Sequence, residues 1–211
     1  MFGGTFNPIH LGHTNTVEQL TVIAGLDQVR YIPAAVPPHR AAPIVSAEHR
    51  LHMVELATAN SPKMVADNRE LERPGPSYTI DTIQSIRTEF PQYTIHLILG
   101  MDAALGLEKW HRWQNLLDEI NLIVMVRPGW DLPETLPAWW TKRTININQL
   151  HKSKAGRISL VPINPVDISS TRIREDLKAG TPLQQWLHPE VLQYIQQHNL
   201  CLLYTSDAAD E

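Results

Sequence analysis

The sequence contains a single cysteine, Cys201, among its 211 residues. One cysteine excludes an intrachain disulfide framework and is typical of a reducing compartment. The chain also lacks any uninterrupted apolar run near the roughly 20 residues that a membrane-spanning helix needs. Its first residues show no basic segment followed by an apolar one, the pattern of a secretory signal peptide. We therefore expect a cytoplasmic location and no membrane partner.

An excess of positive charge is also missing. The 18 Lys and Arg residues are outnumbered by 22 Asp and Glu residues, and the isoelectric point is near 6.2. Proteins that bind nucleic acids usually carry a basic face, so we expect no nucleic-acid partner. The length suits one domain that buries about 70% of its unfolded surface. A small anionic ligand, which needs only a local basic site, remains possible.

The opening residues combine three glycines, a proline and two histidines: Met-Phe-Gly-Gly-Thr-Phe-Asn-Pro-Ile-His-Leu-Gly-His. Without a Cβ, Gly3 and Gly4 let backbone N–H groups approach a phosphate closely. The residue before Pro8 is disfavoured in helical geometry, so a helix can begin only after it. His10 and His13 then lie near a helix N-terminus, where the macrodipole favours anions. The pattern predicts a phosphate site; the alternative is an ordinary tight turn with capped histidines.

Residues 168–174, Ile-Ser-Ser-Thr-Arg-Ile-Arg, form a second candidate phosphate site. Ser169 and Ser170 can cap the free N–H groups of a helix. Arg172 and Arg174 fall in its first turn, where each cation is unfavourable by about 0.3–1 kcal/mol. A docked anion would remove this conflict, because a guanidinium suits phosphate oxygens. The alternative is that both arginines face solvent and pair with the acidic residues that follow.

Short apolar runs alternate with helical patterns along the chain, which is typical of βαβ units and a parallel sheet. Ligands of such sheets bind beyond the carboxyl ends of the strands, where the strand order reverses. We expect an α/β fold with strands at 28–33, 63–67, 94–99, 121–126 and 157–161, helices at 12–24, 46–60, 79–90, 102–107, 113–118, 170–179 and 189–198, and loops at 33–43 and 128–137.

The two candidate phosphate sites resemble signatures of the nucleotidylyltransferase superfamily, H-x-G-H and I-S-x-T-x-I-R. Members transfer a nucleotidyl group from a nucleoside triphosphate to a small phosphorylated acceptor. The resemblance implies a Rossmann-like doubly wound parallel sheet in a single domain. It also implies an ATP site made by Gly3, Gly4, Thr5, His10, Gly12, His13, Asp102, Ser169, Ser170 and Arg174, with Asp102 near the ribose.

Three further segments bear on the acceptor. Pro37-Pro38-His39-Arg40 is a rigid basic corner. Pro76-Ser77-Tyr78-Thr79 opens a predicted helix whose free N–H groups could receive a carboxylate. Trp110 could stack on an aromatic ring. Each segment also has a plain structural explanation as a turn, a cap or a core tryptophan.

The order and spacing of all these pieces resemble the bacterial nicotinate-mononucleotide adenylyltransferase family, from the first glycines to about Leu200. In that family the nicotinate carboxylate meets backbone N–H groups near the positions of Thr79 and His111, and the ring stacks at the Trp110 position. Some relatives carry asparagine where this chain has Ala34-Ala35. The implied substrate-binding residues are His39, Arg40, Tyr78, Thr79, Trp110 and His111.

The resemblance implies that ATP and nicotinate mononucleotide give deamido-NAD and pyrophosphate, a step of NAD biosynthesis. The acceptor phosphate is already ionised, so we expect positioning and electrostatics rather than a covalent intermediate. His13 and His10 would donate toward the α-phosphate, and Arg174 would hold the β- and γ-phosphates. Mg²⁺ would bind mainly through phosphate oxygens and water. We expect no metal-ligating protein residues, since no Cys or Glu completes a zinc site with the histidines.

Two alternatives stay open at this point. One is another adenylyl- or cytidylyltransferase of the same fold, such as the pantetheine-phosphate type. The other is a module that senses dinucleotides without turnover. We expect the domain to cover residues 1–201 with a truncated first strand, and residues 202–211 to be a non-native tail. The oligomeric state does not follow from the sequence.

Overall fold

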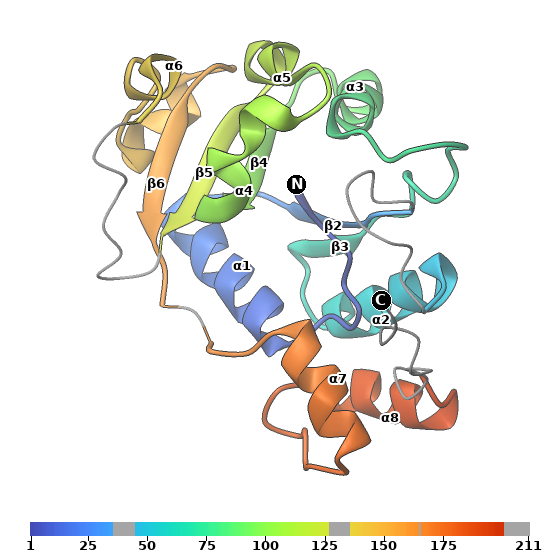
Figure 1. Cartoon of the computed structure of the whole chain (residues 1–211). Helices are drawn as coiled ribbons and strands as arrows, with labels where there is room; N and C mark the ends of the chain where they lie inside the picture. The colour runs from blue at the N-terminus through green and yellow to red at the C-terminus, as the bar shows by residue number, and fades with distance from the viewer. Residues whose placement is uncertain (36–44, 127–135, 165, 201–211) are drawn as a thin grey trace, which may run out of the picture.

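The computed structural model describes residues 1–35, 45–126, 136–164 and 166–200. His39, Arg40, Cys201 and the tail at 202–211 lie outside these residues. The described chain alternates strands with helices, and all its paired strands are parallel (Figure 1). The predicted α/β class with a doubly wound parallel arrangement is confirmed.

Two three-stranded sheets form the centre of the fold. The first has the order β1-β2-β3 and the second the order β4-β5-β6. Burial of both faces explains why these strands are nearly continuous apolar runs. The strands are β1 (Phe2–Gly4), β2 (Val29–Pro33), β3 (Met64–Ala66), β4 (His96–Gly100), β5 (Asn121–Val126) and β6 (Ile158–Pro162).

Met1 connects the two sheets. Its backbone nitrogen donates to the oxygen of His96 at 2.6 Å, and its oxygen accepts from the nitrogen of Ile98 at 3.0 Å. β1 and β4 are therefore neighbours, with β2 and β3 on one side and β5 and β6 on the other. The direction of strand order reverses between them, which is the position where sheets of this kind bind ligands.

Helices cover the sheets, and each of the predicted helices is found within a few residues of its expected position, whereas the short helix Ala138–Thr141 was not predicted. The α-helices are α1 (Leu11–Ile23), α2 (Ala47–Thr58), α3 (Thr79–Glu89), α4 (Met101–Leu105), α5 (Trp113–Glu119), α6 (Ala138–Thr141), α7 (Ser170–Lys178) and α8 (Pro189–Gln197), and 3₁₀ turns lie at Leu107–Lys109 and Ile147–Lys152.

The core has two parts, which lie on opposite faces of the joined sheets because alternate side chains of a strand point to opposite sides. The first, around Leu20 and Tyr31, packs against α1, α2 and α8 and includes Ile123 of β5. The second, around Leu122, packs against α3, α4 and α5 and includes Ile32 of β2. α7 and α8 lie together below α1 and α2 in Figure 1. This arrangement brings a segment near the end of the chain to the turn that follows β1.

Candidate active site

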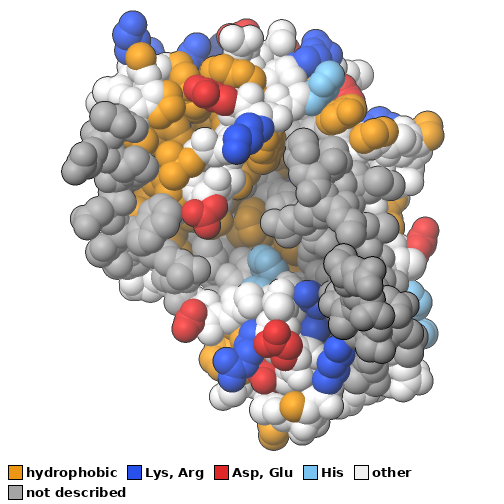
Figure 2. Space-filling view, viewed as in Figure 1, with side chains coloured by type: hydrophobic (Ala, Val, Ile, Leu, Met, Phe, Trp, Pro, Cys, Tyr) orange, Lys and Arg blue, Asp and Glu red, His pale blue; other side chains and the backbone are white. Residues whose placement is uncertain are grey.

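A cavity of about 360 Å³ lies at the carboxyl ends of β1 and β2, between the two halves of the fold. This volume falls within the range of small-molecule sites. Figure 2 shows that this face of the molecule is hollowed, with hydrophobic and histidine side chains inside the hollow. Seven of the predicted site residues line the cavity: Gly3, Gly4, Thr5, Tyr78, Thr79, Trp110 and His111.

The predicted histidine pair lies at the start of α1. His10 is the N-cap, and the imidazoles of His10 and His13 stack with their centroids 3.7 Å apart. A Cβ on Gly12 would lie 2.9 Å from Nδ1 of His10 and 3.0 Å from Cγ2 of Ile168. Gly12 therefore permits both the ring position and the close approach of the segment before α7.

The hydrogen bonding of His13 fixes which of its nitrogens can donate. The backbone N–H of His10 donates to Nδ1 of His13 at 3.3 Å. Nδ1 must then be an acceptor, so a neutral His13 carries its proton on Nε2. Nδ1 of His10 is buried and has no partner among the described residues.

Both imidazoles are strongly desolvated. Burial lowers the pKa of His10 to about 4. Burial, with a smaller effect from His10, lowers the pKa of His13 to about 3. The ring of His13 packs against Phe2 and Phe6, although part of the residue remains accessible to solvent. Both rings are therefore neutral near pH 7 in the absence of an anion.

The second predicted phosphate site folds back onto the first. The hydroxyl of Ser170 donates to the backbone oxygen of Pro8 at 2.9 Å. Nη1 of Arg174 donates to the backbone oxygen of Asn7 at 2.8 Å, and Nη2 donates to Oγ1 of Thr171 at 3.1 Å. The two sequence motifs therefore meet at one place, although they are separated by most of the chain.

The remaining residues of this motif act within α7. The hydroxyl of Ser169 accepts from the backbone N–H of Arg172 and caps the helix, as the sequence predicts. The exposed Arg172 side chain pairs with Asp176 at 3.1 Å, the solvent-facing alternative considered for it. Arg174 instead points toward the turn after β1. The two arginines of the motif thus have different environments.

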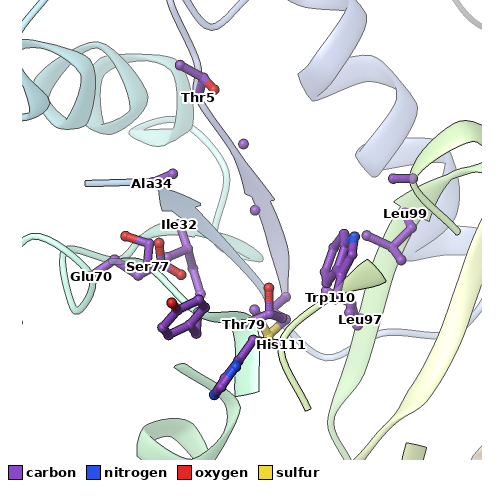
Figure 3. Close-up of a pocket in the computed structure, with 15 residues that line it drawn as sticks. Thr5, Ile32, Ala34, Glu70, Ser77, Thr79, Leu97, Leu99, Trp110 and His111 are labelled. Carbon is purple, nitrogen blue, oxygen red and sulfur yellow. The ribbon is translucent and has the colours of Figure 1, made fainter. Parts of the chain in front are cut away.

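The acceptor segments come from both halves of the fold. Thr79 is the first residue of α3, and the ring of Tyr78 stacks on that of His111 with centroids 4.3 Å apart. Figure 3 shows Trp110 beside Leu97 and Leu99, with Glu70 and Ser77 on the opposite side of the cavity. A planar ring with a carboxylate could thus contact both an aromatic wall and a helix N-terminus.

Asp102 is exposed near the start of α4 and does not line this cavity. It follows β4 at the carboxyl end of that strand, and its neighbour Ala103 does line the cavity. The predicted residues His39 and Arg40 lie outside the described part of the chain. Their contacts with a substrate remain predictions.

Sequence reasoning missed two charged residues at the cavity. Glu70 lines it, and burial raises the pKa of its carboxyl group, which accepts from Oγ1 of Thr82 at 2.7 Å. Arg50 donates hydrogen bonds to the backbone oxygens of Thr5 and Ala34, two residues that line the cavity. The sequence could have drawn attention to Arg50, because this charged residue falls among the buried positions of the predicted helix at 46–60.

Within the described residues, no group of three or more His, Cys, Asp or Glu side chains could hold a metal ion. In the same part of the chain, no helix combines the length and apolarity needed to cross a membrane.

Comparison with known proteins identifies the family of this chain. Residues 1–176 match the cytidylyltransferase-like family. An Aeromonas hydrophila relative, named a probable nicotinate-nucleotide adenylyltransferase, is 44% identical over 203 residues, which is 95% of each chain. A Pseudomonas aeruginosa relative of the same name is 41% identical, also over 95% of each chain.

A solved structure gives independent support for the fold. The nicotinic acid mononucleotide adenylyltransferase of Plasmodium falciparum, complexed with NaAD, aligns with a TM-score of 0.71 over 95% of each chain. Its 20% sequence identity limits this likeness to the fold. The curated relatives are far closer in sequence and share nearly the whole length. By sequence and fold together, this chain belongs to the nicotinate-nucleotide adenylyltransferases, within the cytidylyltransferase-like family.

Proposed function

We propose that the chain transfers the adenylyl group of ATP to nicotinate mononucleotide, giving deamido-NAD and pyrophosphate for NAD biosynthesis. The observation that carries this proposal is the meeting of two phosphate-binding motifs beside a cavity with an aromatic wall. Ser170 and Arg174 reach the turn after β1 through hydrogen bonds of 2.9 and 2.8 Å. The cavity accounts for the acceptor, and the two motifs account for the nucleoside triphosphate.

The reaction is a single displacement at the α-phosphorus. An oxygen of the mononucleotide phosphate forms the new P–O bond, and the bond to the β-phosphate oxygen breaks to release pyrophosphate. The nucleophile needs no base, because its phosphate is ionised near pH 7. The enzyme must hold both anions in line and stabilise the charge that develops on the α-phosphate.

His13 is well suited to that stabilisation. Because Nδ1 accepts from the backbone, its Nε2–H is free to donate to an α-phosphate oxygen. A neutral donor in a desolvated place needs little reorganisation when charge grows on that oxygen. An incoming phosphate also favours protonation of both imidazoles and would raise their low pKa values.

Arg174 would bind the β- and γ-phosphates. Two of the five N–H groups of its guanidinium are used in bonds to Asn7 and Thr171. The others can meet phosphate oxygens in the planar geometry that arginine provides. Mg²⁺ enters this proposal with ATP, since it binds mainly to phosphate oxygens and water and would neutralise part of the triphosphate charge.

Pyrophosphate release from ATP and nicotinate mononucleotide tests the proposal. We expect release that depends on both substrates, and deamido-NAD as the second product. Release with 4′-phosphopantetheine instead of the mononucleotide would favour the pantetheine-phosphate alternative. Binding of dinucleotides without pyrophosphate release would favour a sensing module. The cytoplasmic location stays a prediction to be measured separately.

A further inference from the structure

Arg50 is a charged residue in the buried stripe of α2. The positions that face the core in this helix are Arg50, Met53, Val54 and Ala57, in helical spacing. Arg50 is only 1% exposed, whereas arginine is almost never fully buried without a partner. An explanation for its burial must therefore come from its contacts.

The guanidinium binds backbone oxygens of three separate segments. Nη1 donates to Thr5 after β1 at 2.7 Å, and Nη2 donates to Ala34 after β2 at 2.7 Å and to Ala35 at 3.4 Å. Nε donates to Val45 before α2 at 3.2 Å. Thr5 and Ala34 both line the cavity. One side chain thus connects the two loops that leave β1 and β2.

The charge of Arg50 is not balanced by a nearby acid. No carboxylate forms an ion pair with it among the described residues, and the sequence of residues 36–44 contains no Asp or Glu. The acidic residue that acts on the pKa of Arg50 is Glu48, which is exposed to solvent. Burial lowers the pKa of Arg50, yet a guanidinium stays charged in proteins. A buried cation without an acid is costly unless an anion approaches.

These bonds also set the direction of the peptide groups beside the cavity. In a trans peptide the C=O and N–H groups point in opposite directions. With the oxygen of Ala34 on Arg50, the N–H of Ala35 donates to Oγ of the cavity residue Ser77 at 3.1 Å. With the oxygen of Thr5 on Arg50, the N–H of Phe6 points away and has no acceptor among the described residues.

We propose that Arg50 is a positioning residue for the phosphates of the substrates. It holds the loops after β1 and β2 in one arrangement, and its unbalanced charge attracts the anionic groups that bind there. This inference rests on the proposed function. It assigns to α2 a part in substrate binding that neither phosphate motif contains.

Arg50→Met and Arg50→Lys test the inference, with Arg87→Met as the matched control. Arg87 also donates to backbone oxygens, those of Tyr93 and Glu119, but lies away from the cavity. We expect Arg50→Met to raise the KM of ATP or of nicotinate mononucleotide about tenfold or more, the scale of lost charge-assisted bonds. Arg50→Lys should raise this KM less. The KM of the wild type should rise with added salt, and the KM of Arg50→Met should rise less steeply.

A purely structural role gives a different result. Arg50→Met would then lower the melting temperature and the active fraction, as Arg87→Met does, while KM and its salt dependence stay at wild-type values. That outcome would overturn the inference. If Arg50→Met does not fold, the KM of Arg50→Lys, its salt dependence and its melting temperature distinguish the two roles instead.

A binding measurement separates this inference from the proposed reaction. We expect inorganic tripolyphosphate to raise the melting temperature of the wild type and of Arg87→Met, and to raise that of the Arg50 variants less. Equal shifts in all variants would contradict the role of Arg50 even if the enzyme is active. A wild type that responds to tripolyphosphate but releases no pyrophosphate would contradict the proposed reaction alone.

Discussion

His13 combines a fixed tautomer with a desolvated position, and both follow from its place in the first turn of α1. A preorganised donor of this kind is worth about 10²-fold or more in kcat when removed. We expect His13→Ala to lower kcat by at least about 10²-fold, with a much smaller change in ATP affinity, in steady-state assays. His151→Ala, at an exposed histidine that does not line the cavity, is the control. A normal kcat in His13→Ala would contradict the assignment.

The low pKa values of the histidine pair also affect stability. In the unfolded chain a histidine titrates near 6.5, whereas His10 and His13 titrate near 4 and 3 when folded. Between these values the unfolded state binds more protons, so the free energy of unfolding falls as the pH drops below about 6.5. We expect the His10→Gln/His13→Gln double variant to lose less melting temperature between pH 7 and pH 4.5 than the wild type. Equal losses would show that other groups dominate.

Gly12 is the glycine for which sterics make the sharpest prediction. A Cβ there would meet His10 and Ile168 at 3.0 Å or less, whereas one on Gly100 would meet nothing within 4 Å. Overpacking typically costs about 1–3 kcal/mol. We expect Gly12→Ala to lower both the melting temperature and kcat, and Gly100→Ala to change neither. A Gly12→Ala enzyme with wild-type stability would mean that the turn can relax.

At the scale of elements, α7 matters because one of its arginines faces the turn after β1 and the other faces solvent. We expect Arg174→Ala to raise the KM of ATP, and Arg174→Lys to restore it only in part, because lysine lacks the planar fork. Arg172→Ala removes a neighbouring charge from the same helix and should leave KM unchanged, since its exposed pair with Asp176 contributes little. Equal KM values in wild type and Arg174→Ala would contradict the contact with ATP.

The sequence predicted the longer elements well, because periodic apolar residues mark them. The strand at 121–126 and the helix beginning at residue 79 agree with β5 and α3 at these bounds. It did not predict α6 or the 3₁₀ turn at Ile147–Lys152, which are too short for a period to emerge. Arg50 was missed for a different reason: its partners are backbone oxygens, which no side-chain pattern reveals.

At the scale of the whole molecule, the candidate site is a product of pairing between distant segments. Composition and periodicity indicated a parallel α/β protein, but the position of β1 beside β4 joins Met1 and His96, 95 residues apart. Local patterns do not encode such a pairing, so the doubly wound arrangement came from the family resemblance. The residues of the two phosphate motifs could be named from the sequence, whereas the cavity between the two halves could not be predicted from it.

Both halves also enter the prediction on substrate choice. Thr79 lies in the connection that follows β3 and His111 in the connection that follows β4, and their backbone N–H groups would match the acceptor-only oxygens of nicotinate. The amide of nicotinamide brings its own donors and would leave an N–H unpaired, at a cost of about 1–3 kcal/mol, besides losing a charge-assisted bond. We expect kcat/KM to be at least about 10²-fold higher for the acid mononucleotide, measured by pyrophosphate release.

Trp110→Ala serves as the control for that preference. Stacking does not distinguish an acid from an amide, so this variant should lower kcat/KM for both mononucleotides by a similar factor. Comparable kcat/KM for acid and amide in the wild type would reject the backbone–carboxylate contacts. It would leave the adenylyl transfer itself untouched.

The contacts of α7 have a consequence for how the chain acquires activity as it folds. Ser170 and Arg174 reach their backbone acceptors across 162 and 167 residues of sequence. Contacts of such high sequence separation form late and slowly, because a long loop must close first. A partly folded intermediate, or a nascent chain still lacking α7, can therefore hold β1, α1 and the stacked histidines without being competent for turnover. During refolding, catalytic activity should return with the slowest structural phase, never ahead of it.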